Sequence, residues 1–454
     1  MSHYKPYPAY KESGVEWLGK VPEHWQQMPL KRLVRSIEQG WSPECESWPA
    51  NTGEWGVLKV GCVNGGSFRP EENKALPATL EPRPELAICK GDVLVSRANT
   101  RELVGSCVPV SQDYPNLLLC DKIYRLRAGE LVTTEFLAAL ITVHGRRAVE
   151  VEATGASSSM LNISQSVILD LPVALPASTE QVQIIAAASR ETARIDALIE
   201  KKTRFIELLR EKRQALITHA VTKGLDPNVK MKDSGVEWLG EVPEHWSISP
   251  LKRLISSIGQ GWSPECEARV PEDGEWGVLK VGCVNGGIFR PHESKALPTE
   301  IEPRPELGLS AGDVLISRAN TRELVGSCAV VPHDYPQLLL CDKLYRVGCG
   351  DRITPAFLAA LVSVYGRRAV EIEATGASSS MVNIAQSVIL DLLVAVPNLD
   401  DQTEIMRRIS VETNRIERLC EKTERSIELL KERRSALITA AVTGQIDLRE
   451  QACH

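Results

Sequence analysis

The sequence contains no run of roughly 18 or more apolar residues, although 43% of its 454 residues are apolar. A membrane-spanning helix is therefore not expected. The first residues, Met-Ser-His-Tyr-Lys-Pro-Tyr, also lack the apolar core of a signal peptide. Aromatic residues are sparse at 5%, but the apolar fraction is sufficient for ordinary cores. We expect a cytoplasmic protein that makes no membrane contact.

The twelve cysteines include no Cys-x-x-Cys pair, so a zinc site has little support. Eight of them form four pairs with a constant spacing of 221 residues: Cys45, Cys62, Cys107 and Cys120 recur as Cys266, Cys283, Cys328 and Cys341. Cys89, Cys349, Cys420 and Cys453 have no such partner. This arrangement favours buried, reduced thiols over disulfides.

Complete catalytic motifs are also absent. The segment Gly14–Lys20 matches most of a phosphate-binding loop, but Val21 replaces the Ser or Thr that would hold magnesium, and Glu241 stands in place of Lys20 in a second copy. The sequence has no Gly-x-Ser-x-Gly and no His-Glu-x-x-His motif, and its histidines do not cluster. These absences predict a chain that catalyses no reaction by itself.

The formal net charge of −6 is unlike the basic footprint of most nucleic-acid-binding domains. A local basic surface can still attract DNA when the total charge is acidic.

The chain repeats itself with an offset of 221 residues. The segment Ser13–Trp25 returns as Ser234–Trp246, and Thr222 returns as Thr443, with no insertion or deletion between. A period of this length indicates two copies of a whole domain and not a solenoid. Two copies of one surface suggest a target that is itself two-fold.

Each repeat begins with short β-rich runs between glycines and ends with a long helical segment. In the first repeat the runs cover 55–60, 92–96 and 117–126, and a helix is expected over about 134–149. We therefore expect a mixed α+β domain. The segment 224–233 is a polar linker with a turn signal, and the first dozen residues of the chain look like its truncated counterpart.

From Thr179 to about Thr222 the sequence contains no proline or glycine, and apolar residues recur at coiled-coil spacing. The second copy has the same seam, from Met406 to Ala441. A helix of roughly 44 residues is about 65 Å long. We expect the two helices to pack antiparallel and to place the globular domains at opposite ends. The alternative is that each helix folds back on its own domain.

Four polar, glycine-rich loops are copied nearly intact and are the candidate contact surface. The most informative is Arg97-Ala98-Asn99-Thr100-Arg101, which follows directly after an expected strand. Arginine pairs with guanine, asparagine with adenine, and threonine with phosphate or a thymine methyl group. The alternative is that Arg97 or Arg101 forms an ion pair with Glu102 or Asp92. For Trp41, burial is at least as good an interpretation as base stacking.

The candidate DNA-binding residues of the first copy are Trp41, Ser42, Lys59, Asn64, Arg97, Asn99, Thr100, Arg101, Lys122, Ser157 and Ser158. Those of the second copy are Trp262, Ser263, Lys280, Asn285, Arg318, Asn320, Thr321, Arg322, Lys343, Ser378 and Ser379. No catalytic or metal-binding residue is proposed.

Several of these motifs together resemble the specificity subunits of bacterial type I restriction-modification systems. They are the Ser-Gly-Val-Glu-Trp-Leu-Gly opening at Ser13 and Ser234, the strand motif Gly91–Arg97, and Leu175-Pro176 with Glu180-Gln181 before the long helix. The resemblance covers essentially the whole chain.

The resemblance implies two target recognition domains joined by two long antiparallel spacer helices with pseudo-two-fold symmetry. The expected boundaries are recognition domains at 1–176 and 238–397, spacer helices at 177–223 and 398–445, and a linker at 224–237.

It also implies that the chain reads double-stranded DNA together with two modification and two restriction subunits. The assembled complex would be an adenine-N6 methyltransferase and an ATP-dependent endonuclease. S-adenosylmethionine, ATP and magnesium would belong to the partner subunits, with no cofactor in this chain.

Members of the family usually carry two dissimilar recognition domains, whereas here the two are nearly identical. Both should therefore read the same half-site, and the whole target should be an interrupted palindrome. The main alternative is a stand-alone DNA-binding or scaffold protein built from a duplicated domain. An enzymatic role has little support from the missing motifs.

Overall fold

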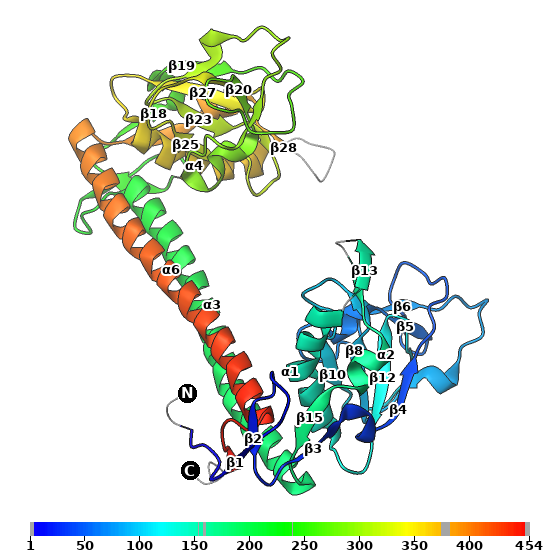
Figure 1. The fold of residues 1–454 in the computed structure, drawn as a ribbon. Coiled ribbons are helices and arrows are strands. Elements are labelled where there is room, and N and C mark those ends of the chain that lie inside the picture. The colour runs from blue at the N-terminus through cyan, green and yellow to red at the C-terminus, as the bar shows by residue number, and fades with distance from the viewer. Residues whose placement is uncertain (1–3, 153, 158–159, 238, 374–381, 450–454) are drawn as a thin grey trace. The chain divides into compact units, whose positions relative to one another are not determined.

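The computed structural model describes residues 4–152, 154–157, 160–237, 239–373 and 382–449, with side chains outside 146–160 and 366–381. It divides into two compact units, and each contains one repeat's globular region and parts of both long helices (Figure 1). Unit 1 comprises residues 1–203 and 425–454, and unit 2 comprises residues 204–424. None of the described helices is long and apolar enough to cross a bilayer.

The centre of unit 1 is an antiparallel four-stranded sheet with the order β10-β8-β12-β4. These strands are Cys107–Pro109, Asp92–Ser96, Ile123–Ala128 and Val34–Gln39, respectively. Helix α1 (Thr134–Glu152) packs against this sheet. Its residues Phe136, Leu137, Leu140 and Ile141 are fully buried, as their spacing predicts.

A second sheet of unit 1 has the order β6-β5-β11-β7. Its strands are Asn73–Ala75, Gly56–Leu58, Tyr114–Leu118 and Ala87–Ile88. The prediction of one β-run over 117–126 is wrong, because β11 ends at Leu118 and β12 begins at Ile123 in the other sheet. Leu118 and Ile123 are both buried, so a continuous apolar run conceals the turn between two sheets.

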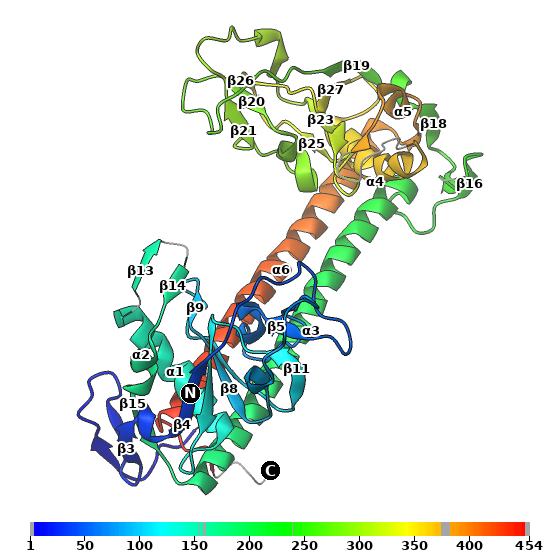
Figure 2. The same ribbon diagram turned by 90° about the vertical axis from the view of Figure 1, so that its right-hand side faces the viewer.

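Three smaller pairings complete unit 1. They are β1 (Tyr10–Glu12) with β2 (Lys20–Pro22), β3 (Gln26–Pro29) with β15 (Pro172–Leu175), and the hairpin β13 (Thr154–Ser157) and β14 (Met160–Asn162) with β9 (Ala98–Asn99). The short helix α2 spans Gln165–Leu169. Figure 2 shows the hairpin and β9 from the side.

Unit 2 repeats this arrangement. Its central sheet is β19 (Ile255–Gln260), β27 (Leu344–Cys349), β23 (Val314–Ser317) and β25 (Cys328–Val330), and its second sheet is β21 (Ser294–Ala296), β20 (Gly277–Leu279), β26 (Tyr335–Leu339) and β22 (Gly308–Leu309). The remaining elements are β16 (Met231–Asp233), β17 (Glu241–Pro243), β18 (Ser247–Pro250), β24 (Ala319–Asn320), β28 (Val382–Asn383), β29 (Leu393–Val396), α4 (Pro355–Glu373) and α5 (Gln386–Leu390).

The long helices expected from the sequence are confirmed as α3 (Ser178–Lys223) and α6 (Leu399–Val442). In unit 1 the start of α3 shares a core with the end of α6, because Ile184 and Ile195 pack in the same cluster as Leu437 and Ala441. In unit 2 the end of α3 shares a core with the start of α6, through Val221 and Ile405. The antiparallel packing is therefore found in each unit, and the folded-back alternative is wrong.

One glutamine in each repeat fixes the start of the long helix. The buried Gln181 donates from Nε2 to the carbonyl oxygens of Leu131 and Pro176, both at 2.9 Å, and its Oε1 accepts the Thr133 N–H. Gln402 makes the corresponding three bonds in unit 2. A buried amide with these hydrogen bonds satisfied holds the long helix to the loop before α1 or α4.

The two units differ where the chain enters them. In unit 2 the linker passes from α3 to β16, and Gly224 packs on Trp246 with a positive φ of 76°. In unit 1 the same place is formed by both ends of the described chain: Gly444 approaches Trp25, and Asp447 forms a β-bridge with Lys5. Residues 4–12 therefore are the expected counterpart of the linker.

The cysteines described by the structure are free, and those buried in both units are Cys62, Cys107, Cys120, Cys283, Cys328 and Cys341. Burial raises the pKa of Cys120 to about 12 and that of Cys341 to about 11. These thiols are therefore protonated at neutral pH and unreactive. Cys453 lies outside the described residues.

Candidate nucleic-acid interface

The candidate loops meet at one edge of the central sheet. Strand β8 ends at Ser96, β12 begins at Ile123 opposite it, and β4 ends at Gln39 opposite Tyr124. The segments that follow or precede these ends therefore lie together: the Trp41 loop, the Arg97–Arg101 loop and the turn that contains Lys122. Unit 2 has the same register, with Ser317 opposite Leu344 and Gln260 opposite Tyr345.

Arg97 holds two of these loops together. Its Nε donates to the Tyr124 hydroxyl at 3.1 Å, and its Nη1 donates to the Asp121 carbonyl at 3.3 Å. The Tyr124 hydroxyl in turn donates to the Ile163 carbonyl. Arg318 makes the same bonds with Tyr345 and Asp342 in unit 2. Part of each guanidinium group is therefore occupied within the protein.

Asn99 is also engaged internally. It is buried, and its Nδ2 donates to the side-chain oxygens of Asn64 and Ser96, both at 3.3 Å. Its Oδ1 accepts the Thr100 N–H at 2.9 Å. Asn320 bonds Asn285, Ser317 and Thr321 in the same way. These asparagines shape the loop, and they leave the next residues at its tip to project outwards.

Thr100 and Arg101 are exposed at that tip, as are Thr321 and Arg322. Asp92 pairs with Arg127 at 3.0 Å and lies 3.8 Å from Arg125, so the alternative in which it pairs with Arg97 or Arg101 is wrong. Within the described chain, no ion pair or hydrogen bond engages the guanidinium group of Arg101 or Arg322. A cation at the end of an exposed loop is suited to contact a phosphate or a base edge.

The remaining candidates fall into three groups. Ser42 and Ser263 hydrogen-bond to Asp121 and Asp342, which ties the Trp loops to the Lys122 and Lys343 turns, where both lysines are exposed. Lys59 and Lys280 form ion pairs with Glu72 and Glu293 at 3.0 and 3.5 Å. Ser157 ends β13 but its side chain is not described, and Ser158, Ser378 and Ser379 lie outside the described residues.

Arg83 and Arg304 were missed by the sequence reasoning. The Arg83 guanidinium carbon lies 4.4 Å from the centre of the Trp41 ring, and Arg304 lies at the same distance from Trp262. Both tryptophans are half-buried and pack against the core of the second sheet of their unit. Burial, the alternative to base stacking for Trp41, therefore applies to part of each side chain. The signal was present in the sequence, because Glu-Pro-Arg-Pro-Glu-Leu occurs in both repeats.

No group of three metal-binding side chains gathers in the part of the chain that the structure describes. The site is therefore described by hydrogen-bond donors, cations and aromatic rings alone.

The comparisons of sequence and of structure both find proteins of type I restriction-modification systems. No family model matches the chain. A segment of 188 residues is 31% identical to the type I restriction enzyme EcoEI specificity subunit of Escherichia coli, and it covers 40% of this chain. The match spans about a third (31%) of that relative's own length.

Two solved structures share the fold over almost the whole chain. A chain of a type I restriction-modification system has a TM-score of 0.64 at 16% identity, covering 94% of this chain and 99% of its own. The HsdS subunit of Thermoanaerobacter tengcongensis has a TM-score of 0.53 at 15% identity, covering 94% of this chain and 98% of its own. The chain thus has the fold of a type I specificity subunit, and the resemblance found in its sequence is confirmed.

Proposed function

We propose that this chain is the DNA-recognition subunit of a type I restriction-modification complex, and that it directs adenine methylation and restriction to a bipartite, palindromic target. The observation that carries the proposal is the duplicated loop: among the described residues, Arg101 and Arg322 are exposed and unengaged in the two repeats of a chain with a specificity-subunit fold. The reaction chemistry, with S-adenosylmethionine, ATP and magnesium, belongs to two modification and two restriction subunits.

The site performs recognition by loop geometry. Arg97 and Asn99 hold the loop in one conformation, so little conformational entropy is lost when Thr100 and Arg101 meet DNA. Lys122 and the Trp41–Arg83 pair at the same edge suit contacts to the phosphate backbone. The duplicated residues in unit 2 read the second half-site, and α3 and α6 set the spacing between the half-sites.

Methylome sequencing of cells that express the complete system tests the proposal. We expect modified adenines in an interrupted palindrome, and two unrelated half-sites would contradict the symmetric target. Replacing Arg101 and Arg322 together by alanine should abolish specific methylation while binding to the modification subunit persists. The matched control replaces Arg32 and Arg253, which are exposed arginines outside these loops. Unchanged methylation in the loop variant would remove these arginines from the interface.

A further inference from the structure

Unit 2 contains a cavity of about 240 Å³ at the start of α6. Its wall includes Leu225, Asp226, His245, Trp246, Asp401 and Ile405. The Trp246 indole N–H has no hydrogen-bond partner among the residues described by the structure. Asp401 lies 3.5 Å from His245 and is partly exposed. We refer to this cavity as the unit 2 socket.

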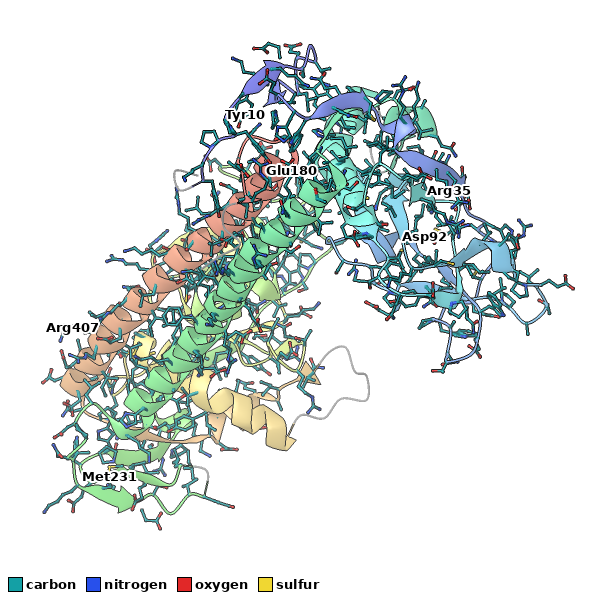
Figure 3. The ribbon with its side chains drawn as sticks, turned by 90° about the horizontal axis from the view of Figure 1, so that it is seen from below. Tyr10, Arg35, Asp92, Glu180, Met231 and Arg407 are labelled. Carbon is teal, nitrogen blue, oxygen red and sulfur yellow. The ribbon has the colours of Figure 1, made fainter. Side chains whose placement is uncertain are left out.

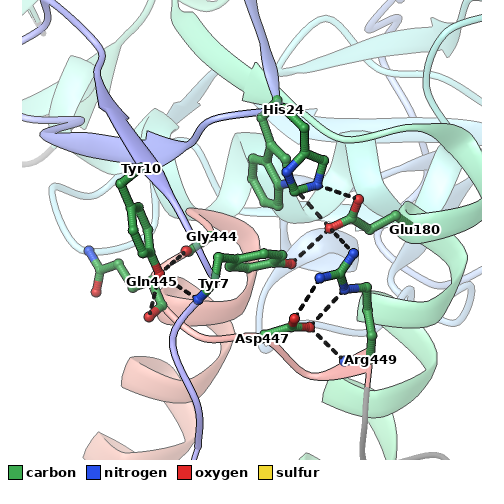
Figure 4. Close-up of polar contacts among 9 residues, drawn as sticks. Tyr7, Tyr10, His24, Glu180, Gly444, Gln445, Asp447 and Arg449 are labelled. Atoms are coloured by element: carbon green, nitrogen blue, oxygen red, sulfur yellow. Dashed lines mark hydrogen bonds and ion pairs between the residues drawn. The ribbon is translucent and has the colours of Figure 1, made fainter.

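In unit 1 the corresponding place is filled by a tyrosine of the chain itself. Tyr7, which Figure 4 shows pointing towards Glu180, is buried, and its ring meets Trp25 edge to face with 5.9 Å between ring centroids. Its hydroxyl donates to the Glu180 carboxylate at 2.9 Å, which also accepts the Trp25 indole N–H at 3.3 Å. His24 lies 2.9 Å from the same carboxylate.

A cation completes the filled site of unit 1. The Arg449 guanidinium lies 4.9 Å from the centre of the Tyr7 ring and 3.8 Å from the Glu180 carboxylate. Asp447 holds it in place through two hydrogen bonds to the side chain. The buried Tyr7 and Glu180 therefore form one cluster with the half-buried Arg449, and the Glu180 carboxylate is compensated by donors on several sides.

Unit 2 has a tryptophan, a histidine and a carboxylate at the positions that surround Tyr7 in unit 1, but it lacks the tyrosine and the arginine. With the offset of 221, Trp246 and His245 correspond to Trp25 and His24, and Asp401 corresponds to Glu180. Asn228, which is exposed, stands at the position of Tyr7. The linker that replaces the two chain ends supplies Asp226-Pro227-Asn228, with no aromatic residue and no arginine.

We propose that the unit 2 socket binds a tyrosine side chain of a modification subunit, with a basic residue next to it. This inference rests on the proposed function. The ring would pack on Trp246, the hydroxyl would donate to Asp401, and the basic neighbour would face Asp226 and Asp401. Tyrosine and arginine are the residues that most often anchor protein interfaces. A second copy of this chain is disfavoured as the partner, because its Tyr7 is already buried in its own unit 1.

Filling the socket from within tests the proposal. The double variant Asn228→Tyr with Asp401→Glu gives unit 2 the tyrosine and the glutamate of unit 1. The full chain is titrated with the purified modification subunit by calorimetry. We expect the affinity to fall by about tenfold or more, which is the loss of one anchoring residue. The matched control is Lys230→Tyr, which places a tyrosine on the same linker at an exposed position outside the socket, and it should bind like the original chain.

A second measurement does not depend on that variant folding. Leu225 is exposed at the socket wall, and Leu225→benzoylphenylalanine should form a photo-cross-link to a modification-subunit peptide that contains a tyrosine beside a basic residue. A cross-link to a peptide without tyrosine, or equal affinity of the filled chain and the control, would overturn the socket proposal alone. If the original chain bound no modification subunit, the proposed function would fail with it.

Discussion

At the scale of single residues, the two units differ in a buried charge network. In unit 1 the guanidinium group of the buried Arg125 forms an ion pair and hydrogen bonds with Glu38. The same guanidinium group lies 3.8 Å from the carboxylate of the buried Asp92. The hydrogen bond from Arg125 holds the pKa of Glu38 below its usual value. In unit 2 Gly259 and Gly348 replace Glu38 and Arg127, and Arg346 bonds only the carbonyl oxygens of Glu306 and Gly308 within the described structure. Figure 3 marks Asp92 in the region of the unit 1 sheet.

We expect Asp92→Ala to cost about 3 kcal/mol of unit 1 stability, because it removes a partner of two arginines and leaves buried charge less compensated. Urea unfolding with hydrogen exchange read in β8 and β12 measures the loss. The matched control is Asp313→Ala in unit 2. Asp313 accepts the Ser310 N–H but has no ion pair with Arg346 in the described structure, so about 1 kcal/mol is expected. Equal losses in the two units would contradict the network.

A second residue-scale prediction concerns His144, which is buried against Trp17 with 4.9 Å between ring centroids. Burial lowers the pKa of His144 to about 4. Between pH 6.5 and 4 the unfolded chain therefore binds a proton at this residue and the folded chain does not. The free energy of unfolding is unaffected by His144 above pH 6.5, and it decreases as the pH falls from 6.5 towards 4.

The variant His144→Tyr introduces the residue found at the equivalent position 365 of unit 2. Thermal unfolding between pH 7.5 and 5 should show a smaller loss of stability for this variant than for the original chain. The full shift corresponds to about 3 kcal/mol, most of it below pH 6. Parallel curves for the two chains would show that His144 is not the group responsible.

At the scale of elements, the glutamine at the start of each long helix makes a prediction. Gln181→Met keeps the approximate size of the side chain but leaves three backbone groups, one of them buried and two part-buried, without their partner. The expected cost is about 3 kcal/mol, with early hydrogen exchange at the junction of α3 and α1. Gln183→Met on the same helix turn is exposed and serves as the control, with a change near zero.

Elements with a strong local pattern could be predicted from the sequence. The spacing of apolar residues gave α1, α3 and α6, and the run Asp92–Ser96 matches β8. The turn at Cys120–Lys122 could not be seen, because apolar residues on both sides hide a change of sheet. Similarly, the internal bonds of Arg97 and Asn99 depend on Tyr124 and Asn64, which are distant in the sequence. The residue types in a loop indicate which groups it can contact, but they do not indicate which of its side chains are already hydrogen-bonded within the protein.

At the scale of the whole molecule, the duplication predicts that the same substitution in either repeat has the same effect on DNA affinity. Arg101→Ala and Arg322→Ala, made singly, should each lower DNA affinity by a similar factor, because each removes one contact from a half-site of the same sequence. Each contact is expected to contribute about 1–3 kcal/mol. Fluorescence anisotropy with the palindromic duplex, in the assembled complex and at fixed salt concentration, measures both. A difference of more than tenfold between the two would show that the units read different sequences.

The division of the long helices between the units has a consequence for biosynthesis. Unit 2, residues 204–424, is one continuous stretch, whereas unit 1 needs residues 425–449 to cover the start of α3 and to place Arg449 beside Tyr7. During translation unit 1 therefore begins first and is completed only after the whole of unit 2 has emerged from the ribosome. Until then the start of α3 lacks the α6 residues of its core, such as Leu437 and Ala441. The unit that begins first in the sequence is thus the one whose last residues are synthesised last, although the two units have nearly the same sequence.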